Sequence, residues 1–193
     1  INLYKITFMQ QYYEKNKLEI GLDEAGRGSL LGPVFTAGVI LNDTGVYPPP
    51  YPIKDSKKCS EKVRRELRKY IEQNSIAYCV EKIDIDRIDK VNILNATMEG
   101  MENCVDNITS VINVDRLLVD GNYFPTYMDK STFKHIPHVC IPGGDDKYLN
   151  IAAASILAKE YRDEYIINLC ETNSILDNYD IRNNKGYGTK SHM

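Results

Sequence analysis

Two β-rich runs flank a glycine-punctuated turn in LEIGLDEAGRGSLLGPVFTAGVIL, residues Leu18–Leu41. The first run, Leu18–Asp23, alternates apolar and other side chains with the period of two that a half-buried strand shows. The second run, Val34–Leu41, is also rich in residues that favour strands. We expect the two runs to pair as neighbouring antiparallel strands.

Strand-like and helical segments alternate along the rest of the chain. The prolines of Asp43–Pro52 predict a loop. Ser60 is a good N-cap for a helix whose apolar positions, Val63, Leu67, Tyr70 and Ile71, recur at helical spacing. Further elements are expected as a strand over Ile76–Ile83, a helix over about Asn92–Ile108 with Leu94, Met98, Met101, Cys104, Val105 and Ile108 inward, strands at Leu117–Val119 and Val139–Ile141, and a helix from Asp145 or Asp146 to about Cys170. This alternation predicts an α/β fold with parallel crossovers after the antiparallel pair.

Length and composition indicate one domain. The chain has 193 residues and is 42% hydrophobic, enough for one good core. We take residues 1–193 as a single catalytic domain with a polar N-terminal extension over 1–17. No apolar run is long enough to span a membrane, so we expect a soluble, cytoplasmic monomer.

The five widely spaced cysteines are predicted to be reduced structural thiols: Cys59, Cys79, Cys104, Cys140 and Cys170.

The charge is unevenly distributed. A net charge of −3 argues against indiscriminate binding of nucleic acid. However, Lys54–Lys69 contains eight basic and three acidic residues, a local balance of +5. This segment is either a patch that faces phosphates or the solvated face of a helix, and charge alone does not separate the two.

Carboxylates fall at the ends of predicted strands or at the start of a helix. Asp23 and Glu24 follow the first strand, Asp120 follows an apolar strand, and Asp145 follows two glycines. Strand ends in an open α/β sheet are the usual place for a ligand. Carboxylates without histidine or cysteine favour Mg²⁺ or Mn²⁺, and a pair of such ions hydrolyses phosphodiesters. Each residue taken alone is also an ordinary turn or capping residue.

Local geometry restricts this set. Neighbouring residues on a strand point to opposite faces, so Glu24 must lie where the strand has turned or reach round with its longer side chain. Asp163 is eighteen residues beyond Asp145, roughly 27 Å along a helix, and is expected to form an ion pair within that helix. Asp146 is closer and is harder to exclude from the site.

The motif Gly21–Val34, GLDEAGRGSLLGPV, resembles the signature of type 2 ribonucleases H, the ribonuclease HII family. Further motifs match in order: DSKK at 55–58, NILNAT at 92–97, LVDG at 118–121, GD at 144–145, IAAASILAK at 151–159, RD at 162–163 and KGYGTKSH at 185–192. The similarity covers nearly everything after Leu18. It implies the ribonuclease H-like fold, a mixed five-stranded sheet flanked by helices.

The resemblance also implies a reaction and its residues. It makes Asp23, Glu24, Asp120 and Asp145 the catalytic ligands of two Mg²⁺ or Mn²⁺ ions. The substrates implied are RNA/DNA hybrids and duplex DNA with embedded ribonucleotides, cut on the 5′ side of the ribonucleotide to leave 5′-phosphate and 3′-hydroxyl ends.

Substrate contacts follow from the same resemblance. Gly26, Arg27 and Gly28 would sense the 2′-hydroxyl, the group that distinguishes RNA from DNA, and Tyr187 would pack on the adjoining deoxyribose. Phosphate contacts are implied for Lys57, Lys58, Ser155 and Lys159. Without the family, both glycine-flanked motifs are weak signals that are common in turns.

The chain departs from the family pattern at three places. Ser29 replaces a usual proline, so we expect a looser turn. Asp146 replaces a small residue and is either an extra metal-site carboxylate or a favourable charge at a helix N-terminus, the reading we favour. The sequence ends at Met193, where relatives usually continue with another helix and a tail.

Two other functions remain open at this stage. Another nuclease of the same fold, such as a junction resolvase or a DNA exonuclease, would cleave substrates made only of DNA. A non-catalytic module with a degenerate site would bind hybrids without cutting them, although the presence of all four carboxylates counts against it.

Overall fold

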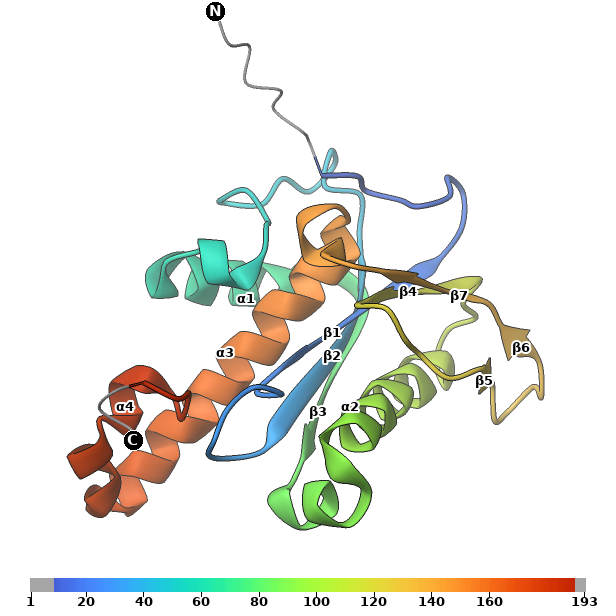
Figure 1. Ribbon diagram of the computed structural model, residues 1–193. Helices are drawn as coiled ribbons and strands as arrows, with labels where there is room; N and C mark the ends of the chain where they lie inside the picture. Colours follow the sequence, from blue (N-terminus) through green and yellow to red (C-terminus); the bar gives the residue numbers. More distant parts are fainter. Residues whose placement is uncertain (1–8, 190–193) are drawn as a thin grey trace, which may run out of the picture.

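A mixed five-stranded sheet forms the centre of the computed structural model, which describes residues 9–189 (Figure 1). The strand order is β3-β2-β1-β4-β7. Antiparallel pairing joins β1 to β2 and β2 to β3, whereas β4 is parallel to both β1 and β7. The strands are β1 Glu19–Ala25, β2 Val34–Leu41, β3 Ser75–Ile83, β4 Arg116–Asp120 and β7 His138–Ile141. The predicted mixed five-stranded sheet is confirmed.

Helices cover both faces of the sheet (Figure 1). On one face α1 (Glu61–Asn74) and α3 (Leu149–Thr172) share a core with β2, and on the other α2 (Ile85–Thr109) packs on β1 and β4. As predicted, the Ser60 hydroxyl caps α1 by accepting from the Val63 N–H. The remaining short elements are η1 Ser56–Lys58, β5 Tyr127–Met128, β6 His135–Ile136, η2 Gly144–Asp146, η3 Ser174–Tyr179 and α4 Ile181–Asn184.

Small residues let α3 lie directly against β1. Ala152, Ala153 and Ala154 are fully buried, and a Cβ at Gly21 would come within 2.2 Å of the Asn150 backbone. The Asn150 amide then ties α3 to two strands, since it donates to the Glu19 carbonyl at 2.7 Å and accepts from the Leu41 N–H at 3.1 Å. These contacts hold α3 over the part of β1 that carries Asp23.

The second helix is longer than the sequence predicted and is broken. It begins at Ile85, and Asn92 inside it has the non-helical angles φ 67 and ψ 165. The Asn92 side chain accepts from the Asn95 N–H at 3.0 Å and so caps the second segment, which is the helix that periodicity detected.

One residue predicted to face the core of this helix does not. Leu94 is 37% exposed. At this end of the helix Ile93 and Ala96 pack on Val34 and Ile83 instead. The other inward positions are buried: Met98, Met101, Cys104, Val105 and Ile108.

The third helix begins later than predicted. Asp145 and Asp146 lie in the short turn η2, and the extended residue Tyr148 separates this turn from the start of α3 at Leu149. The backbone of Gln10 is hydrogen-bonded across this break, to Lys147 at 2.8 Å and to Leu149 at 3.0 Å. The N-terminal segment therefore braces the turn that holds Asp145.

Two global expectations concern disulfides and membranes. All five cysteines are free thiols in the structure. Among residues 9–189 no helix combines the length and apolar character needed to cross a bilayer.

Candidate active site

Two aspartates lie side by side on neighbouring parallel strands. The pairing of Leu22 with Val119 places Asp23 of β1 next to Asp120 of β4. Both side chains are on the face covered by α3, because residues two apart on a strand share a face and Gly21 meets Asn150 of that helix. Asp23 is only 5% exposed.

Asp145 is brought to the same place by a tight turn. Gly143 adopts the left-handed conformation, with φ 63, and redirects the chain after β7. The Gly144 N–H then donates to Asp120 Oδ1 at 2.7 Å. Asp145 follows at once and is 7% exposed. Three carboxylates from three separate segments therefore meet beneath the start of α3.

Glu24 joins them from within a strand rather than after it. The pattern in the sequence ended the first strand at Asp23, but β1 continues to Ala25 because Glu24 still pairs with Thr36 of β2. The Glu24 side chain is 19% exposed and lies 3.8 Å from the Arg27 guanidinium. The charges of Asp120 and Asp145 both raise its pKa, so the Glu24 carboxylate is within electrostatic range of the other two.

The carboxylates repel one another in a partly dry setting. Burial, followed by the charges of Glu24 and Asp120, holds the pKa of Asp23 well above its usual range. Burial and Asp120 raise the pKa of Asp145 to about 6. Burial also raises the pKa of Glu24, although Arg27 opposes this. A cation placed among these groups would relieve both the repulsion and the desolvation.

The donor set suits a hard divalent ion, which prefers oxygen ligands. Within residues 9–189, however, no three carboxylate, histidine or cysteine side chains are arranged to bind a single ion. Mg²⁺ is commonly held by one or two carboxylates together with substrate phosphates rather than by a complete protein cage. The site therefore has the right chemistry for such an ion without forming a closed pocket around it.

Serine side chains support Asp23 from α3 and η1. The Ser155 hydroxyl is close enough to Asp23 to oppose the rise in its pKa, and Asp23 accepts from the Glu24 N–H at 2.7 Å. The Ser155 hydroxyl also lies 3.0 Å from that of Ser56. Sequence reasoning gave Ser155 a phosphate contact and gave Ser56 no role, although the latter belongs to the DSKK motif that it singled out.

The two lysines of that motif have different surroundings. Partial burial works to lower the pKa of Lys57, but Asp55, Asp23 and Asp145 together raise it. Its exposed ammonium is therefore within range of the charges of the carboxylates. Lys58 instead forms an exposed ion pair with Asp146 at 2.5 Å. Asp146 lies in the first turn of η2 rather than of α3, so the helix N-terminus favoured from the sequence is that of the shorter helix, and the Asp146 charge also contributes to the raised pKa of Asp145.

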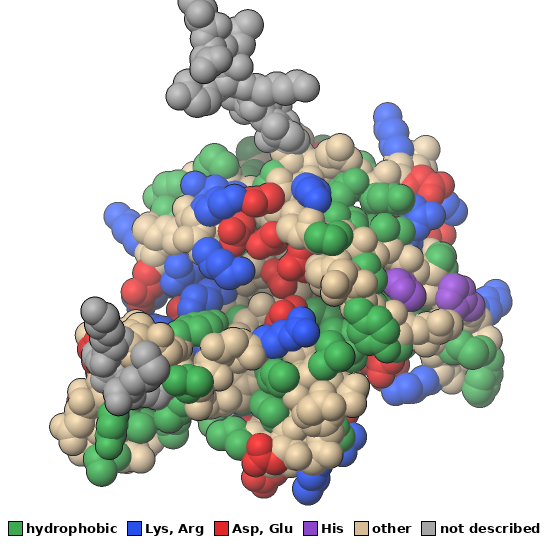
Figure 2. Space-filling model, in the orientation of Figure 1, with side chains coloured by type: hydrophobic (Ala, Val, Ile, Leu, Met, Phe, Trp, Pro, Cys, Tyr) green, Lys and Arg blue, Asp and Glu red, His purple; other side chains and the backbone are tan. Residues whose placement is uncertain are grey.

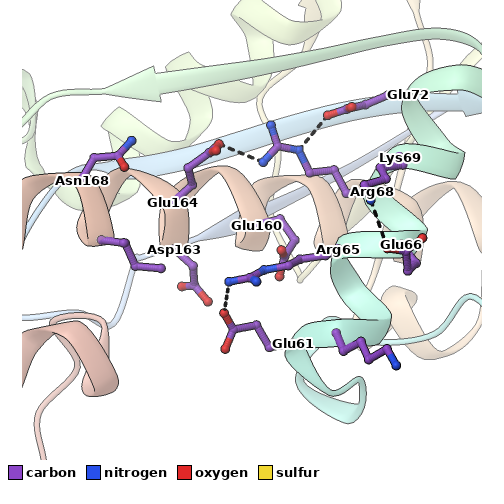
Figure 3. Close-up of a pocket in the computed structure, with 12 residues that line it drawn as sticks. Glu61, Arg65, Glu66, Arg68, Lys69, Glu72, Glu160, Asp163, Glu164 and Asn168 are labelled. Carbon is purple, nitrogen blue, oxygen red and sulfur yellow. Dashed lines mark hydrogen bonds and ion pairs between the residues drawn. The ribbon is translucent and has the colours of Figure 1, made fainter.

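Figure 2 shows acidic side chains gathered in the middle of one face, with lysine and arginine side chains beside them. A separate cleft of about 940 Å³ between α1 and α3, shown in Figure 3, includes none of the four predicted metal ligands and is lined by four basic side chains of α1: Lys62, Arg65, Arg68 and Lys69. Ion pairs within the cleft join Arg65 to Glu61, Lys69 to Glu66, and Arg68 to Glu72 and Glu164. For α1, this favours a solvated helix face over a phosphate-binding patch.

Asp163 takes part in ion pairs, as predicted. Its carboxylate lies 2.7 Å from Lys159 one turn earlier on α3. It also lies 3.4 Å from Arg64 of α1, which bonds to Glu160 at 2.7 Å. The ammonium of Lys159, a predicted phosphate contact, is further placed 5.1 Å from the centre of the Tyr187 ring.

The predicted substrate-reading turn and Tyr187 are close together. Gly26 has φ +102, a conformation that favours glycine. The Ser29 hydroxyl donates to the Gly26 carbonyl at 2.7 Å, which gives the turn a restraint that was not expected from the loss of the family proline. Ser29 and Tyr187 form an isolated backbone bridge. Behind both lies Arg162, which sequence reasoning noted only as part of a motif.

The model of the family described as ribonuclease HII matches residues 20–193. The chain belongs to the ribonuclease HII family. It is 43% identical over 186 residues to ribonuclease HII of Bacteroides thetaiotaomicron, which covers 94% of this chain and 84% of that protein. Ribonuclease HII of Bacteroides fragilis is 44% identical over 180 residues, covering 91% and 80% respectively. This member of the ribonuclease HII family is therefore a ribonuclease H, a hydrolase.

Solved structures agree with this assignment. The PCNA:RNase HII complex from Archaeoglobus fulgidus contains a chain that matches with a TM-score of 0.64 and 27% identity, covering 90% of this ribonuclease HII chain and 83% of that one. Bst-RNase HIII, in a structure described as a complex with Mn²⁺, matches with a TM-score of 0.63 and 16% identity, covering 81% and 55%. The second likeness shows the fold alone.

Proposed function

We propose that this ribonuclease H cleaves the RNA strand of RNA/DNA hybrids and cuts duplex DNA on the 5′ side of embedded ribonucleotides. The products would carry 5′-phosphate and 3′-hydroxyl ends. The observation that carries the proposal is the meeting of Asp23, Asp120 and Asp145 close to Glu24 and the turn that follows it, where burial and mutual repulsion raise the pKa values of Asp23 and Asp145. Phosphodiester chemistry and recognition of RNA would thus be adjacent.

In this proposal Asp23, Glu24, Asp120 and Asp145 are the catalytic residues and hold two Mg²⁺ or Mn²⁺ ions. The four oxygen donors and the raised pKa values of Asp23, Glu24 and Asp145 support this assignment, since a divalent cation would stabilise the ionised forms. When bound, such ions supply an activated water and stabilise the leaving oxygen of the phosphodiester. The protein would keep Asp23 in place through Ser155 and the Glu24 N–H.

The substrate would be read beside the carboxylates. Gly26, Arg27 and Gly28 would contact the 2′-hydroxyl, since glycine lets the backbone approach a sugar closely. A Cβ at Gly28 would meet nothing within 4 Å, so this position is open to a ligand. Tyr187 would pack on the sugar of the adjoining deoxynucleotide.

The proposed phosphate contacts differ in the interactions that each side chain already makes in the structure. Lys57 is the strongest candidate, because its pKa is raised by the charges of the carboxylates that would flank the scissile phosphate. Lys58 and Lys159 would first have to exchange their bonds to Asp146 and Asp163. Ser155 would contact phosphate only in addition to Asp23 and Ser56.

Three 5′-labelled duplexes would test the proposal: DNA with one ribonucleotide, a uniform RNA/DNA hybrid and DNA alone. Each is incubated with Mg²⁺, Mn²⁺ or EDTA. We expect cuts in the first two with either metal, none in DNA alone, and a 3′-hydroxyl on the upstream product. Cleavage of DNA alone would favour a general nuclease, and metal-independent binding without products would favour a non-catalytic module.

A further inference from the structure

A buried arginine connects the two predicted substrate-reading segments. The Arg162 side chain, on α3, is fully buried. Its guanidinium donates to three backbone carbonyls: Leu31 at 2.9 Å, Pro33 at 3.2 Å and Lys185 at 2.9 Å. The first two carbonyls belong to the end of the glycine-rich turn, and the third immediately precedes the Gly-Tyr-Gly motif.

These two segments are remote in sequence but are joined along a seam. The Leu30 N–H donates to the Gly186 carbonyl at 2.9 Å, beside the bridge between Ser29 and Tyr187. A Cβ at Gly186 would lie 2.8 Å from the Leu31 carbonyl oxygen. The three bonds from Arg162 reach both sides of this seam, Leu31 and Pro33 on one side and Lys185 on the other.

Arg162 also contacts two of the residues proposed to bind the substrate, Gly26 and Tyr187. A Cβ at Gly26 would come within 2.3 Å of Arg162 Nε, so Gly26 rests directly on the guanidinium. The ring of Tyr187 has its centre 5.0 Å from the Arg162 Cζ, within the range of a cation–π contact. One planar group thus supports both the glycine turn and the aromatic ring.

Lysine could not replace this arrangement. A guanidinium presents a rigid fork of donors in one plane, whereas an ammonium is a compact charge on a flexible stem. Burying a charged side chain is costly, and an apolar residue of similar size could fill the same space. What the arginine provides that an apolar residue does not is its fork of donors, which fixes the carbonyls of Leu31, Pro33 and Lys185 relative to one another.

We propose that Arg162 is a specificity-determining positioning residue that holds the Gly26–Gly28 turn and Tyr187 at a fixed separation, matched to one ribonucleotide–deoxyribonucleotide step. This inference rests on the proposed function. A uniform hybrid offers a ribonucleotide at every position, so its cleavage should tolerate a changed separation between the Gly26–Gly28 turn and Tyr187. A duplex with a single ribonucleotide offers only one productive register, so its cleavage should be sensitive to that change.

The test compares R162K with R68K as a matched control. Arg68 also stacks on a tyrosine, with its Cζ 3.9 Å from the centre of the Tyr161 ring, and bonds to two carboxylates, but it lies between α1 and α3 away from the seam. For each variant, kcat and KM are measured on the single-ribonucleotide duplex and on the hybrid, and the urea unfolding curve records stability.

R162K is expected to lower kcat/KM on the single-ribonucleotide duplex about 10- to 100-fold more than on the hybrid, the scale of a misplacement near 1 Å. R68K should leave the ratio unchanged. An equal loss on both substrates, or no loss, overturns the proposal. If R162K does not fold, G186A displaces the same seam with Arg162 intact and must shift the ratio in the same direction; an unchanged ratio overturns the proposal.

The two proposals fail differently. If the wild type cleaves the hybrid but not the single-ribonucleotide duplex, the proposed reading of embedded ribonucleotides is wrong, and the role of Arg162 is overturned with it. If the wild type cleaves both and the variants keep its ratio, only the role of Arg162 is overturned.

Discussion

Asp120 accepts a 2.7 Å hydrogen bond from the backbone N–H of Gly144. The bond joins the end of β4 to the turn that carries Asp145, so one carboxylate helps to place another. The charge and the hydrogen bond of Asp120 therefore have separate consequences, because one concerns the metal ions and the other concerns the turn.

Asn and Ala substitutions at Asp120 should separate these roles. D120N keeps an acceptor for Gly144 but loses the charge, so we expect a wild-type unfolding midpoint and a loss of cleavage beyond the roughly 10- to 100-fold typical of residues that only support a ligand. D120A also leaves the Gly144 N–H without this partner, which costs about 1–3 kcal/mol. Turnover near the wild-type rate in D120N would remove Asp120 from the mechanism.

Asp145 should make stability depend on pH in an unusual direction. Burial and Asp120 raise its pKa to about 6 in the folded protein, whereas an unfolded aspartate titrates near pH 3.9. The folded state therefore binds the proton more readily between these values, and this contribution to stability grows as the pH falls from about 6 towards 4. In EDTA its size should be roughly 1–3 kcal/mol.

D145N isolates this contribution. At pH 7 in EDTA the variant should be more stable than the wild type, and the difference should shrink by pH 5 as the wild-type carboxyl is protonated. Mg²⁺ at pH 7 should raise the unfolding midpoint of the wild type more than that of D145N, because a ligand stabilises the state that binds it. Urea unfolding at several pH values measures both effects, and a difference that grows towards pH 5 would contradict the assignment.

Local pattern was sufficient for much of the fold. Alternation and β-rich composition gave β2 its observed bounds, Val34–Leu41, and the Ser60 cap marked the start of α1. The break at Asn92 escaped detection because a positive φ at a single asparagine leaves the helical period on either side nearly intact. The late start of α3 also escaped, since Gln10 pairs with Lys147 and Leu149 from far away in the sequence.

Some features of the candidate site were likewise predictable from local sequence pattern, and others were not. Strand ends indicated that Asp23 and Asp120 would be neighbours, and the register confirms that they are. The partners of long side chains were not predictable, because no local pattern determines that Arg64 meets Glu160 or that Arg162 meets three carbonyls. Such contacts depend on how helices and loops pack after the sheet has formed.

The two lysines of the DSKK motif should differ in their effect on substrate binding. Lys57 faces the carboxylates, so K57A should raise KM by about 10-fold or more, as expected for a lost charge-assisted contact. Lys58 is in an exposed pair with Asp146, so K58A should change KM by less than about threefold. KM measured against salt concentration should show a slope reduced by about one in K57A. A larger effect in K58A would reverse the assignment.

Alanine substitutions at Gly26 and Gly28 should affect different properties: G26A should lower stability, whereas G28A should lower activity. Gly26 has φ +102 and lies against Arg162, so G26A should lose about 1–3 kcal/mol of stability. Gly28 has open space around it, so G28A should unfold like the wild type. If the Gly28 backbone approaches the ribose, the added methyl group should nevertheless lower kcat/KM on both RNA-containing duplexes by about 10- to 100-fold. Full activity in G28A would show that the glycine is not needed for that approach, whereas a folded but inactive G28A would locate the ribose beside it.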